Sequence, residues 1–455
     1  TPIKLKMVIP MGRSDRDNHE QQKGCSRSHK DCDLYHIIYN LDRGEGGRDE
    51  GTVTMAHKIT DTSENSGARF PSVRPGGGYV AYVKAHTDDD DDDPNEYDPV
   101  TNNIAIIDIE GAVSKRIIKN AKWPNWFGQN KIIYQDESNE DNKKIKLAEL
   151  EEGANPKVGN KWSFSRLLGS EESEFVEECK EASISWDKEE EEKVYATECS
   201  KGITYSDPYM LPGSDSSFIV TKKDGPQFIA EEDYGYDCVV YDMDSNLQAR
   251  PTKEVSNHNI GHCYGRYANE FWGGGDDYKP DRFVKNREGK WEVSNTNDSG
   301  GKYGFSPLEN GADLSDMVEG DAGKLKNTFK QEYCQPDAAP GHLSQIYYSY
   351  GDFCPGGEVS NYLIVSIMCG RIDKDTGEDD NGEQREAEET YGDGVVDSPS
   401  DKKRETEYSR TFLIDVSDIN KAKYYDITLA VEKYLGVEEY TWEGVSGDCY
   451  EVVAE

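Results

Sequence analysis

The side chains best suited to chemistry gather in one short segment, residues 257–266, which reads N-H-N-I-G-H-C-Y-G-R. Imidazole, phenol and guanidinium groups all donate hydrogen bonds, and the first two also exchange protons. A second segment, P-G-H-L-S-Q, adds another imidazole and an amide further along the chain. The candidate residues are His258, His262, Tyr264, Arg266, His342 and Gln345. No G-x-S-x-G pattern occurs, so a peptidase carrying its own serine triad is not predicted.

Alternating carboxylates mark two further segments, D-K-D-T-G-E-D-D from residue 373 and D-M-D-S-N from residue 242. Oxygen ligands at every second residue of a tight loop point inward and can surround a hard cation. Neither segment completes the helix-loop-helix calcium pattern, and Asp242 also fits an ordinary hairpin. The pattern predicts bound calcium, with Asp373, Asp375, Asp379, Asp242 and Asp244 as ligands, and no nucleotide cofactor.

The chain is strongly acidic, with 90 Asp and Glu residues against 52 Lys and Arg residues and a formal net charge of -38. Such a surface repels nucleic acid and anionic membranes, and it suits cations, a salty medium or basic partners. The acid is concentrated in runs at 88–93, 189–192 and 373–389. A charge run is usually a solvated loop, and cations or a neighbouring surface are the alternative reason for it.

Ten cysteines indicate an oxidising compartment. No two C-x-x-C pairs follow one another, so a zinc ribbon is not supported. Pairing each cysteine with a near neighbour along the chain predicts these disulfides: Cys25 with Cys32, Cys179 with Cys199, Cys238 with Cys263, Cys334 with Cys354, and Cys369 with Cys449.

Other features fit the secretory route. The sequence begins at Thr1 and has no apolar run long enough for a signal peptide or a membrane span. We therefore expect a secreted, extracellular or periplasmic protein whose signal peptide has been removed. Asn297, in the triplet N-D-S, is a predicted glycosylation site.

One motif occurs twice and organises the elements that must position these residues. Residues 68–83 read A-R-F-P-S-V-R-P-G-G-G-Y-V-A-Y-V, and residues 121–134 read A-K-W-P-N-W-F-G-Q-N-K-I-I-Y. Each copy has an aromatic residue, a proline, a glycine-containing turn and a short apolar strand. Repetition at a period of roughly 40 to 50 residues with about four strands per unit is typical of a β-propeller.

The sequence thus predicts an all-β protein, a single β-propeller domain over residues 1–455 with long acidic loop insertions. Counting units predicts about seven four-stranded blades, with six or eight as alternatives. The strand expected over residues 3–10 is the candidate for closing the ring in the last blade. Irregular insertions are expected at 295–339 and 373–408.

The segments Phe70-Pro71-Ser72-Val73 and Trp123-Pro124-Asn125-Trp126, with the strands that follow them, resemble the repeats of TolB-like β-propellers. That group includes TolB, prolyl-oligopeptidase propellers, and oligogalacturonate and ulvan lyases. The resemblance to oligogalacturonate lyases implies a metal site of histidines and a glutamine, here His258, His262, His342 and Gln345. The resemblance to ulvan lyases implies charge neutralisation and proton transfer by His262, Tyr264 and Arg266. Because innermost strands converge on the axis, His262 and His342 are expected to face one channel.

Three functions remain open. The favoured one is a non-enzymatic extracellular building block for assembly or adhesion, which binds cations and glycans and contacts its own copies or other extracellular proteins. The second is a polysaccharide lyase acting on a uronate-containing glycan, with its site around His262 and His342. The alternative for these two histidines is a structural role, in which their side chains form hydrogen bonds between blades. A lyase for a polyanion needs a basic cleft, and the chain has few basic clusters. The third is a lectin-like binding module. Nucleic acid and membrane insertion are not expected.

Overall fold

The computed structural model describes residues 3–13, 25, 32–43, 49–62, 66–87, 100–111, 113–138, 143–169, 183–184, 193–194, 204–214, 216–223, 236–243, 249–254, 260–275, 280–288, 291–293, 343–355, 360–372, 404–417, 423–439, 441–445 and 447–454. The predicted insertion at 295–339 and most of the one at 373–408 lie outside these residues. In the described part, no helix is both long and apolar enough to cross a membrane.

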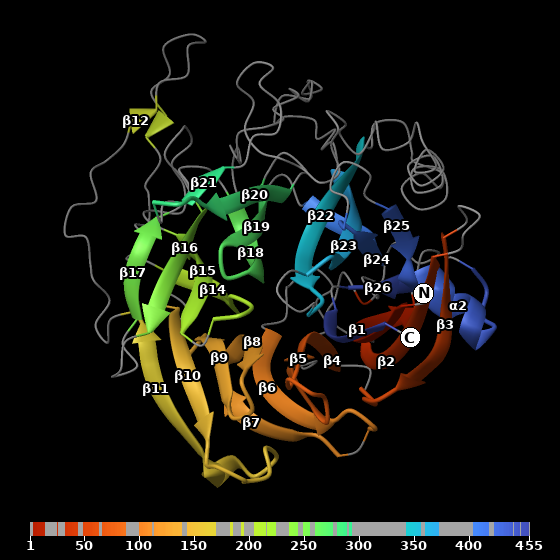
Figure 1. Cartoon of the computed structure of the whole chain (residues 1–455), viewed down its shortest axis with the longest axis horizontal. Helices are drawn as coiled ribbons and strands as arrows, with labels where there is room; N and C mark the ends of the chain where they lie inside the picture. Colours follow the sequence, from red (N-terminus) through yellow and green to blue (C-terminus); the bar gives the residue numbers. More distant parts are fainter. Residues whose placement is uncertain are drawn as a thin grey trace.

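Six antiparallel sheets form a ring of blades, and the chain runs through them clockwise in Figure 1. Blade 1 contains β1 (Ile3–Arg13), β2 (Asp33–Arg43) and β3 (Asp49–Lys58). Blade 2 contains β4 (Ser66–Val73), β5 (Tyr79–Thr87), β6 (Val100–Asp108) and β7 (Lys115–Lys119). Blade 3 contains β8 (Ala121–Phe127), β9 (Lys131–Asp136), β10 (Lys144–Leu150) and β11 (Trp162–Leu168), with a short 3-10 helix, η1 (Gly159–Lys161), before β11.

The other three blades have the same order from the axis outward. Blade 4 contains β14 (Thr204–Met210), β15 (Ser217–Lys223), β16 (Tyr236–Met243) and β17 (Ala249–Glu254). Blade 5 contains β18 (Ile260–Tyr267), β19 (Glu270–Gly275), β20 (Pro280–Lys285) and β21 (Trp291–Val293). Blade 6 contains β22 (Leu343–Phe353), β23 (Tyr362–Ile372), β24 (Arg404–Asp415) and β25 (Lys423–Asp426).

The prediction of seven blades is wrong, because the described residues form six blades. Residues 162–205 have the length and the strand-like segments of one more unit, but they do not form a blade. There the structure has β11, which is the outer strand of blade 3, and a separate hairpin of β12 (Ser183–Ile184) and β13 (Lys193–Val194). A blade needs several strands with apolar faces to pack on its neighbours. This segment supplies one such strand and then a hairpin with only two residues per strand, beside the acidic run 189–192.

The hydrophobic core lies between the blades. Ile104 and Ile106 of blade 2 pack with Ile132 and Tyr134 of blade 3, and similar clusters fill the other junctions. Inner strands are therefore covered on both faces, and every residue of β4 is buried.

The ring closes in blade 1. Two C-terminal strands, β26 (Trp442–Gly444) and β27 (Asp448–Ala454), pair antiparallel with β1, so the two ends of the chain lie close together in Figure 1. The strand predicted over residues 3–10 is thus the one with which the two C-terminal strands pair. A β-bulge between Lys6 and Met7 interrupts the ladder opposite Tyr450.

One helix, α2 (Ile427–Leu435), follows β25 and lies at the outer rim of the ring. The Asp426 side chain accepts a hydrogen bond from Leu429 N at 2.8 Å and caps the helix, and Gly436 ends it in the left-handed conformation at φ 66°. Its buried face includes Ile427 and Val431, which join the core between blades 6 and 1. The analysis of the sequence did not predict this helix.

Candidate functional site

A cavity of about 90 Å³ lies on the axis of the ring. The innermost strands of blades 2 to 6, and the residues at the start of β27, all contribute to its wall. Its lining is partly aromatic, from Phe70, Trp123, Tyr209 and Tyr264, and partly acidic. A concave site where several elements converge is the default place for a ligand in a folded protein.

Three inner strands shape this wall with the same kinked backbone. Phe70, Trp123 and Asp207 each precede a proline, and their φ values are 46°, 55° and 50°. Left-handed φ is unfavourable for residues other than glycine. A register shift of the strand ladder accompanies each of them, so each inner strand bulges at the axis. The proline motif therefore sets the direction of the side chains at the centre of the ring.

The aromatic side of the cavity is built from neighbouring blades. The rings of Phe70 and Trp123 lie with centroids 3.8 Å apart. The Lys122 ammonium group lies 5.5 Å from the Phe70 ring centroid and 5.1 Å from that of Trp123. Burial lowers the pKa of Lys122, and the carboxylates of Glu137 and Asp207 act in the opposite direction.

A pair of carboxyl groups forms the opposite side. Asp352 of β22 and Asp448 of β27 are hydrogen-bonded to each other. The Tyr209 hydroxyl donates to Asp352, and the backbone N–H of Val73 donates to Asp448. This network joins blades 4, 6, 1 and 2 across the axis.

Burial raises the pKa of both carboxyl groups. The negative charge of Asp448 adds to this effect at Asp352, because two adjacent carboxylates in a poorly solvated site repel each other. The pair is thereby set to share one proton, with one group neutral and the other ionised. Burial, followed by the charge of Asp352, also raises the pKa of Tyr209, so this phenol stays protonated and acts as a hydrogen-bond donor.

Tyr264, a predicted catalytic residue, lines the cavity. Burial raises its pKa above the ordinary value of a phenol, so it is neutral. Its ring lies directly against Gly351, where an added Cβ atom would be only 2.6 Å from the ring carbon Cζ. Tyr264 is therefore tightly packed between blades 5 and 6.

Arg266 does not face the cavity. Its guanidinium pairs with Glu270 at 3.0 Å, and its Nε donates to the Ser360 carbonyl at 2.7 Å. It also donates to Asn361 Oδ1 and to the Val416 carbonyl, at 3.3 Å and 3.5 Å. Arg266 is 5% exposed, and these partners belong to the junction of blades 5 and 6. In this position the side chain links the two blades through hydrogen bonds and an ion pair.

The structure does not test most of the remaining predicted site residues. His262 is in β18 and Gln345 in β22, without a described side-chain position. His258, His342, Asp244, Asp373, Asp375, Asp379 and Asn297 lie outside the described residues. Asp242 accepts a hydrogen bond from Ser217 Oγ across a β-ladder, which is an ordinary hairpin contact. Within the described ranges, no three His, Cys, Asp or Glu residues form a group that would hold a metal ion.

The cysteine predictions are partly confirmed. Disulfides join Cys25 to Cys32 and Cys238 to Cys263, as predicted. The partners predicted for Cys354 and Cys449 are wrong, since these two residues pair with each other and not with Cys334 and Cys369. Because these two cysteines are 95 residues apart, pairing near neighbours along the chain cannot identify this disulfide. Cys179 and Cys199 lie outside the described residues.

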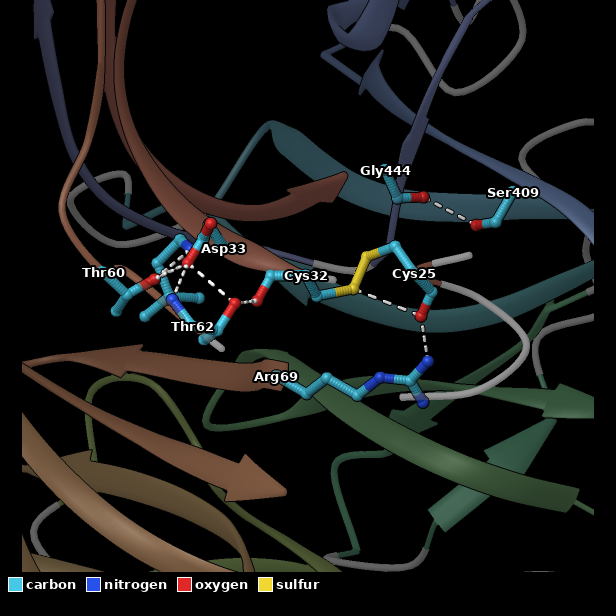
Figure 2. The surroundings of a disulfide bond; sticks show 9 residues. Cys25, Cys32, Asp33, Thr60, Thr62, Arg69, Ser409 and Gly444 are labelled. Atoms are coloured by element: carbon cyan, nitrogen blue, oxygen red, sulfur yellow. Dashed lines mark hydrogen bonds between the residues drawn. A yellow bond between two sulfur atoms is a disulfide. The ribbon is translucent and has the colours of Figure 1, made fainter. Parts of the chain in front are cut away.

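Figure 2 shows how the first disulfide is held. The Arg69 guanidinium of β4 donates to the Cys25 carbonyl, and the Cys32 carbonyl accepts hydrogen bonds from Ala68 N and Thr62 Oγ1. Both cysteines pack against Val445, which follows β26. This disulfide consequently lies between blade 2 and the C-terminal strands.

Asp207, Tyr209, Asp352 and Asp448 were not among the predicted site residues. Two signals were present. The segment D-P-Y at 207–209 is a third copy of the residue-before-proline motif, and both axial carboxyl groups come shortly before a cysteine, in D-F-C and D-C. Neither signal shows that the two aspartates meet, because their contact depends on ring closure.

No protein-family model and no curated protein sequence matches the chain. Solved structures do match the chain. The β-propeller domain of the Trilobed protease from Pyrococcus furiosus is 11% identical over 75% of this chain and 92% of that chain, with a TM-score of 0.31. The β-propeller domain of Cps50 (Swd1) from Myceliophteria thermophila is 9% identical over 81% of this chain and 82% of that chain, with a TM-score of 0.33. The tricorn protease is 14% identical, and the match covers 72% of this chain but 29% of that chain, with a TM-score of 0.31. The ring of antiparallel sheets in the described residues confirms the predicted resemblance to propellers at the level of the fold.

Proposed function

We propose that this propeller is a non-catalytic building block of an extracellular assembly or adhesive surface. The observation that carries the proposal is the closure of the ring, which is fastened in three ways at one place. β27 pairs along β1, the Cys354–Cys449 disulfide links blade 6 to β27, and the Asp352–Asp448 contact lies beside that disulfide. A ring held in this way resists opening, as a structural unit outside the cell must.

The chemistry of the buried groups supports the same proposal. Arg266 donates to acceptors within the protein, and Tyr264 is tightly packed. Both observations argue against the charge neutralisation and proton transfer that the resemblance to ulvan lyases implies for these residues. Disulfides persist in oxidising compartments, which supports a place outside the cytoplasm. Cations and glycans are the partners that we propose for the acidic surface, given the net charge of -38.

Assays on uronate polysaccharides test the non-catalytic part of the proposal. Purified protein is incubated with ulvan, oligogalacturonate and alginate, and the ultraviolet absorbance of an unsaturated product is followed. We expect no increase above the buffer blank. A rate that disappears in Tyr264→Phe, with an unchanged melting temperature, would show that the protein is a lyase.

Light scattering and electron microscopy test the assembly part. The molar mass is followed as protein concentration rises, at several concentrations of NaCl and with calcium or a chelator. We expect the mass to exceed that of one 51.2 kDa chain and ordered particles to appear. A single monomeric species under all of these conditions would contradict the proposal.

A further inference from the structure

β7 is a basic edge on an acidic protein. It is the outermost strand of blade 2 and pairs on one side only, with β6. It reads K-R-I-I-K, and in Figure 1 it lies at the lower rim of the ring. Lys115, Arg116 and Lys119 are exposed, whereas Ile118 is buried against the blade. Just before the strand, Val113 is 74% exposed, the largest value among the exposed apolar side chains of the described residues.

The three cations of β7 have no acidic partner among the residues that the structure describes. Other surface lysines do have one: Lys58 lies 2.9 Å from Asp61, Lys146 lies 2.5 Å from Asp136, and Lys161 lies 2.7 Å from Glu151. With a net charge of -38, most cations of this chain are expected to find a carboxylate nearby. Within the described part of the chain, the edge of β7 therefore carries a concentrated positive charge without a neutralising carboxylate.

The outer strands of the other blades differ from β7. β3 reads D-E-G-T-V-T-M-A-H-K, β11 reads W-S-F-S-R-L-L and β21 reads W-E-V. None of these places three cations within five residues without an acid. Positive charge on an edge strand prevents two identical edges from pairing, because like charges would face each other. The same charge attracts an edge or surface of opposite sign.

We propose that the β7 edge, with Val113, docks on an acidic surface of a second copy of this chain. The contact joins two different surfaces, since two β7 edges repel each other. A contact of this kind propagates from copy to copy and forms a closed ring or an open filament. The chain supplies the complementary partner in abundance, because acidic residues outnumber basic ones by 38. This inference rests on the proposed assembly function and names the surface that mediates it.

Charge reversal tests the inference. In the triple variant Lys115→Glu, Arg116→Glu, Lys119→Glu, the edge becomes acidic. The matched control Arg13→Glu, Arg287→Glu, Lys433→Glu changes the net charge equally at three exposed positions in other blades and in α2. Sedimentation velocity and static light scattering measure association at about 0.1 M NaCl, where charges beyond roughly 10 Å are screened, and again at 1 M.

We expect the wild-type protein and the control to associate at the lower salt concentration and less at 1 M. The β7 variant should associate at least about tenfold more weakly, because like charges then face each other across the contact. Near-ultraviolet circular dichroism verifies that both variants are folded. Association of the β7 variant at wild-type strength overturns this inference and leaves the assembly function standing. A wild-type protein that never associates overturns both.

Zero-length carbodiimide crosslinking provides a second measurement that needs no variant. A mixture of unlabelled and ¹⁵N-labelled protein is crosslinked and digested, and peptides that combine the two isotopes identify contacts between copies. We expect such peptides to join Lys115 or Lys119 to an Asp or Glu. Their absence from an associated sample, with mixed-isotope crosslinks only at other lysines, overturns the inference.

Discussion

Two groups of buried charges, both involving blade 6, differ in how their charge is balanced. In the first, Arg410 of β24 is fully buried and pairs with Asp426 at 3.0 Å and with Glu432 of α2 at 3.2 Å. In the second, Asp352 and Asp448 meet on the axis, beside the Tyr209 hydroxyl and the backbone N–H of Val73. The first cluster is balanced by opposite charge. In the second, a shared proton leaves one of the two carboxyl groups neutral.

The difference shows which part of the molecule responds to pH. The acids of the Arg410 cluster also serve the fold, because Asp426 caps α2 and Glu432 accepts a hydrogen bond from Trp442 N at 2.8 Å. A shared proton is lost when the pH exceeds the raised pKa of the pair, so the stability that the axial contact contributes is expected to fall as the pH rises.

Removing Arg410 should have the largest effect. Arg410→Met leaves Asp426 and Glu432 buried without their cation, and we expect the free energy of unfolding to fall by about 3–5 kcal/mol. Urea denaturation followed by tryptophan fluorescence measures the loss. A loss below about 1 kcal/mol would show that the cluster is no more valuable than an exposed ion pair.

His36 should have the next largest effect, on the acid side. Its Nε2 lies 2.7 Å from the Tyr450 hydroxyl of β27, and burial, then His57 and Lys6, lower its pKa from 6.5 to about 4. Protonation favours the unfolded chain between these values, so this contribution to stability is complete above pH 6.5 and is lost as the pH falls through about 4.

In His36→Gln, the loss of stability between pH 7 and pH 4 should be smaller than in the wild type by at most about 2 kcal/mol. Urea midpoints at several pH values measure this difference. An equal change of the urea midpoint with pH in the two proteins would show that protonation of His36 does not weaken the closure of blade 1.

Asp448→Asn tests the axial pair directly and should raise stability by about 1 kcal/mol at pH 8. The amide oxygen still accepts from Val73 N, and the amide nitrogen donates to Asp352 without a second negative charge. A carboxyl group with a raised pKa contributes stability that is complete below about pH 3.8 and is lost as the pH rises through the folded-state pKa. The variant should therefore resemble the wild type near pH 4 and exceed it at pH 8.

Melting temperatures across this pH range measure the effect. The control is Asp61→Asn, which alters an exposed carboxylate whose pKa is lowered by Lys58. It should not gain stability at pH 8. An Asp448→Asn protein less stable than the wild type at pH 8 would mean that the pair is held by a cation and not by a shared proton.

The smallest effect is expected for an exposed ion pair. Lys161 and Glu151 lie 2.7 Å apart, with side chains 41% and 62% exposed. Lys161→Met should change the free energy of unfolding by less than about 1 kcal/mol, because water and salt screen the pair. The same denaturation experiment as for Arg410→Met measures it. A larger loss would remove the contrast between buried and exposed pairs in this fold.

Much of the fold could be predicted from particular residues. The repeated motif around Phe70-Pro71 and Trp123-Pro124 predicted propeller repeats, and its two copies form β4 and β8, the inner strands of blades 2 and 3. The left-handed backbone before each proline was not predicted. Cys25 and Cys32 are seven residues apart, and Cys238 and Cys263 lie 25 apart on adjacent blades, so these two pairs follow from closeness along the chain. The error in blade number arose where residues 162–205 alternate like strands but lack the apolar faces that a blade needs.

The sequence by itself determined the strands, the turns between them and the sign of the surface, since these depend on neighbouring residues and on composition. Only the tertiary structure decided the number of blades, the partner of Cys354 and the contact of Asp352 with Asp448, 96 residues later in the chain. The physical reason is closure of the ring. Because β27 pairs with β1, Asp448 and Cys449 lie next to the end of β22. No local sequence pattern specifies which residues such a closure brings together.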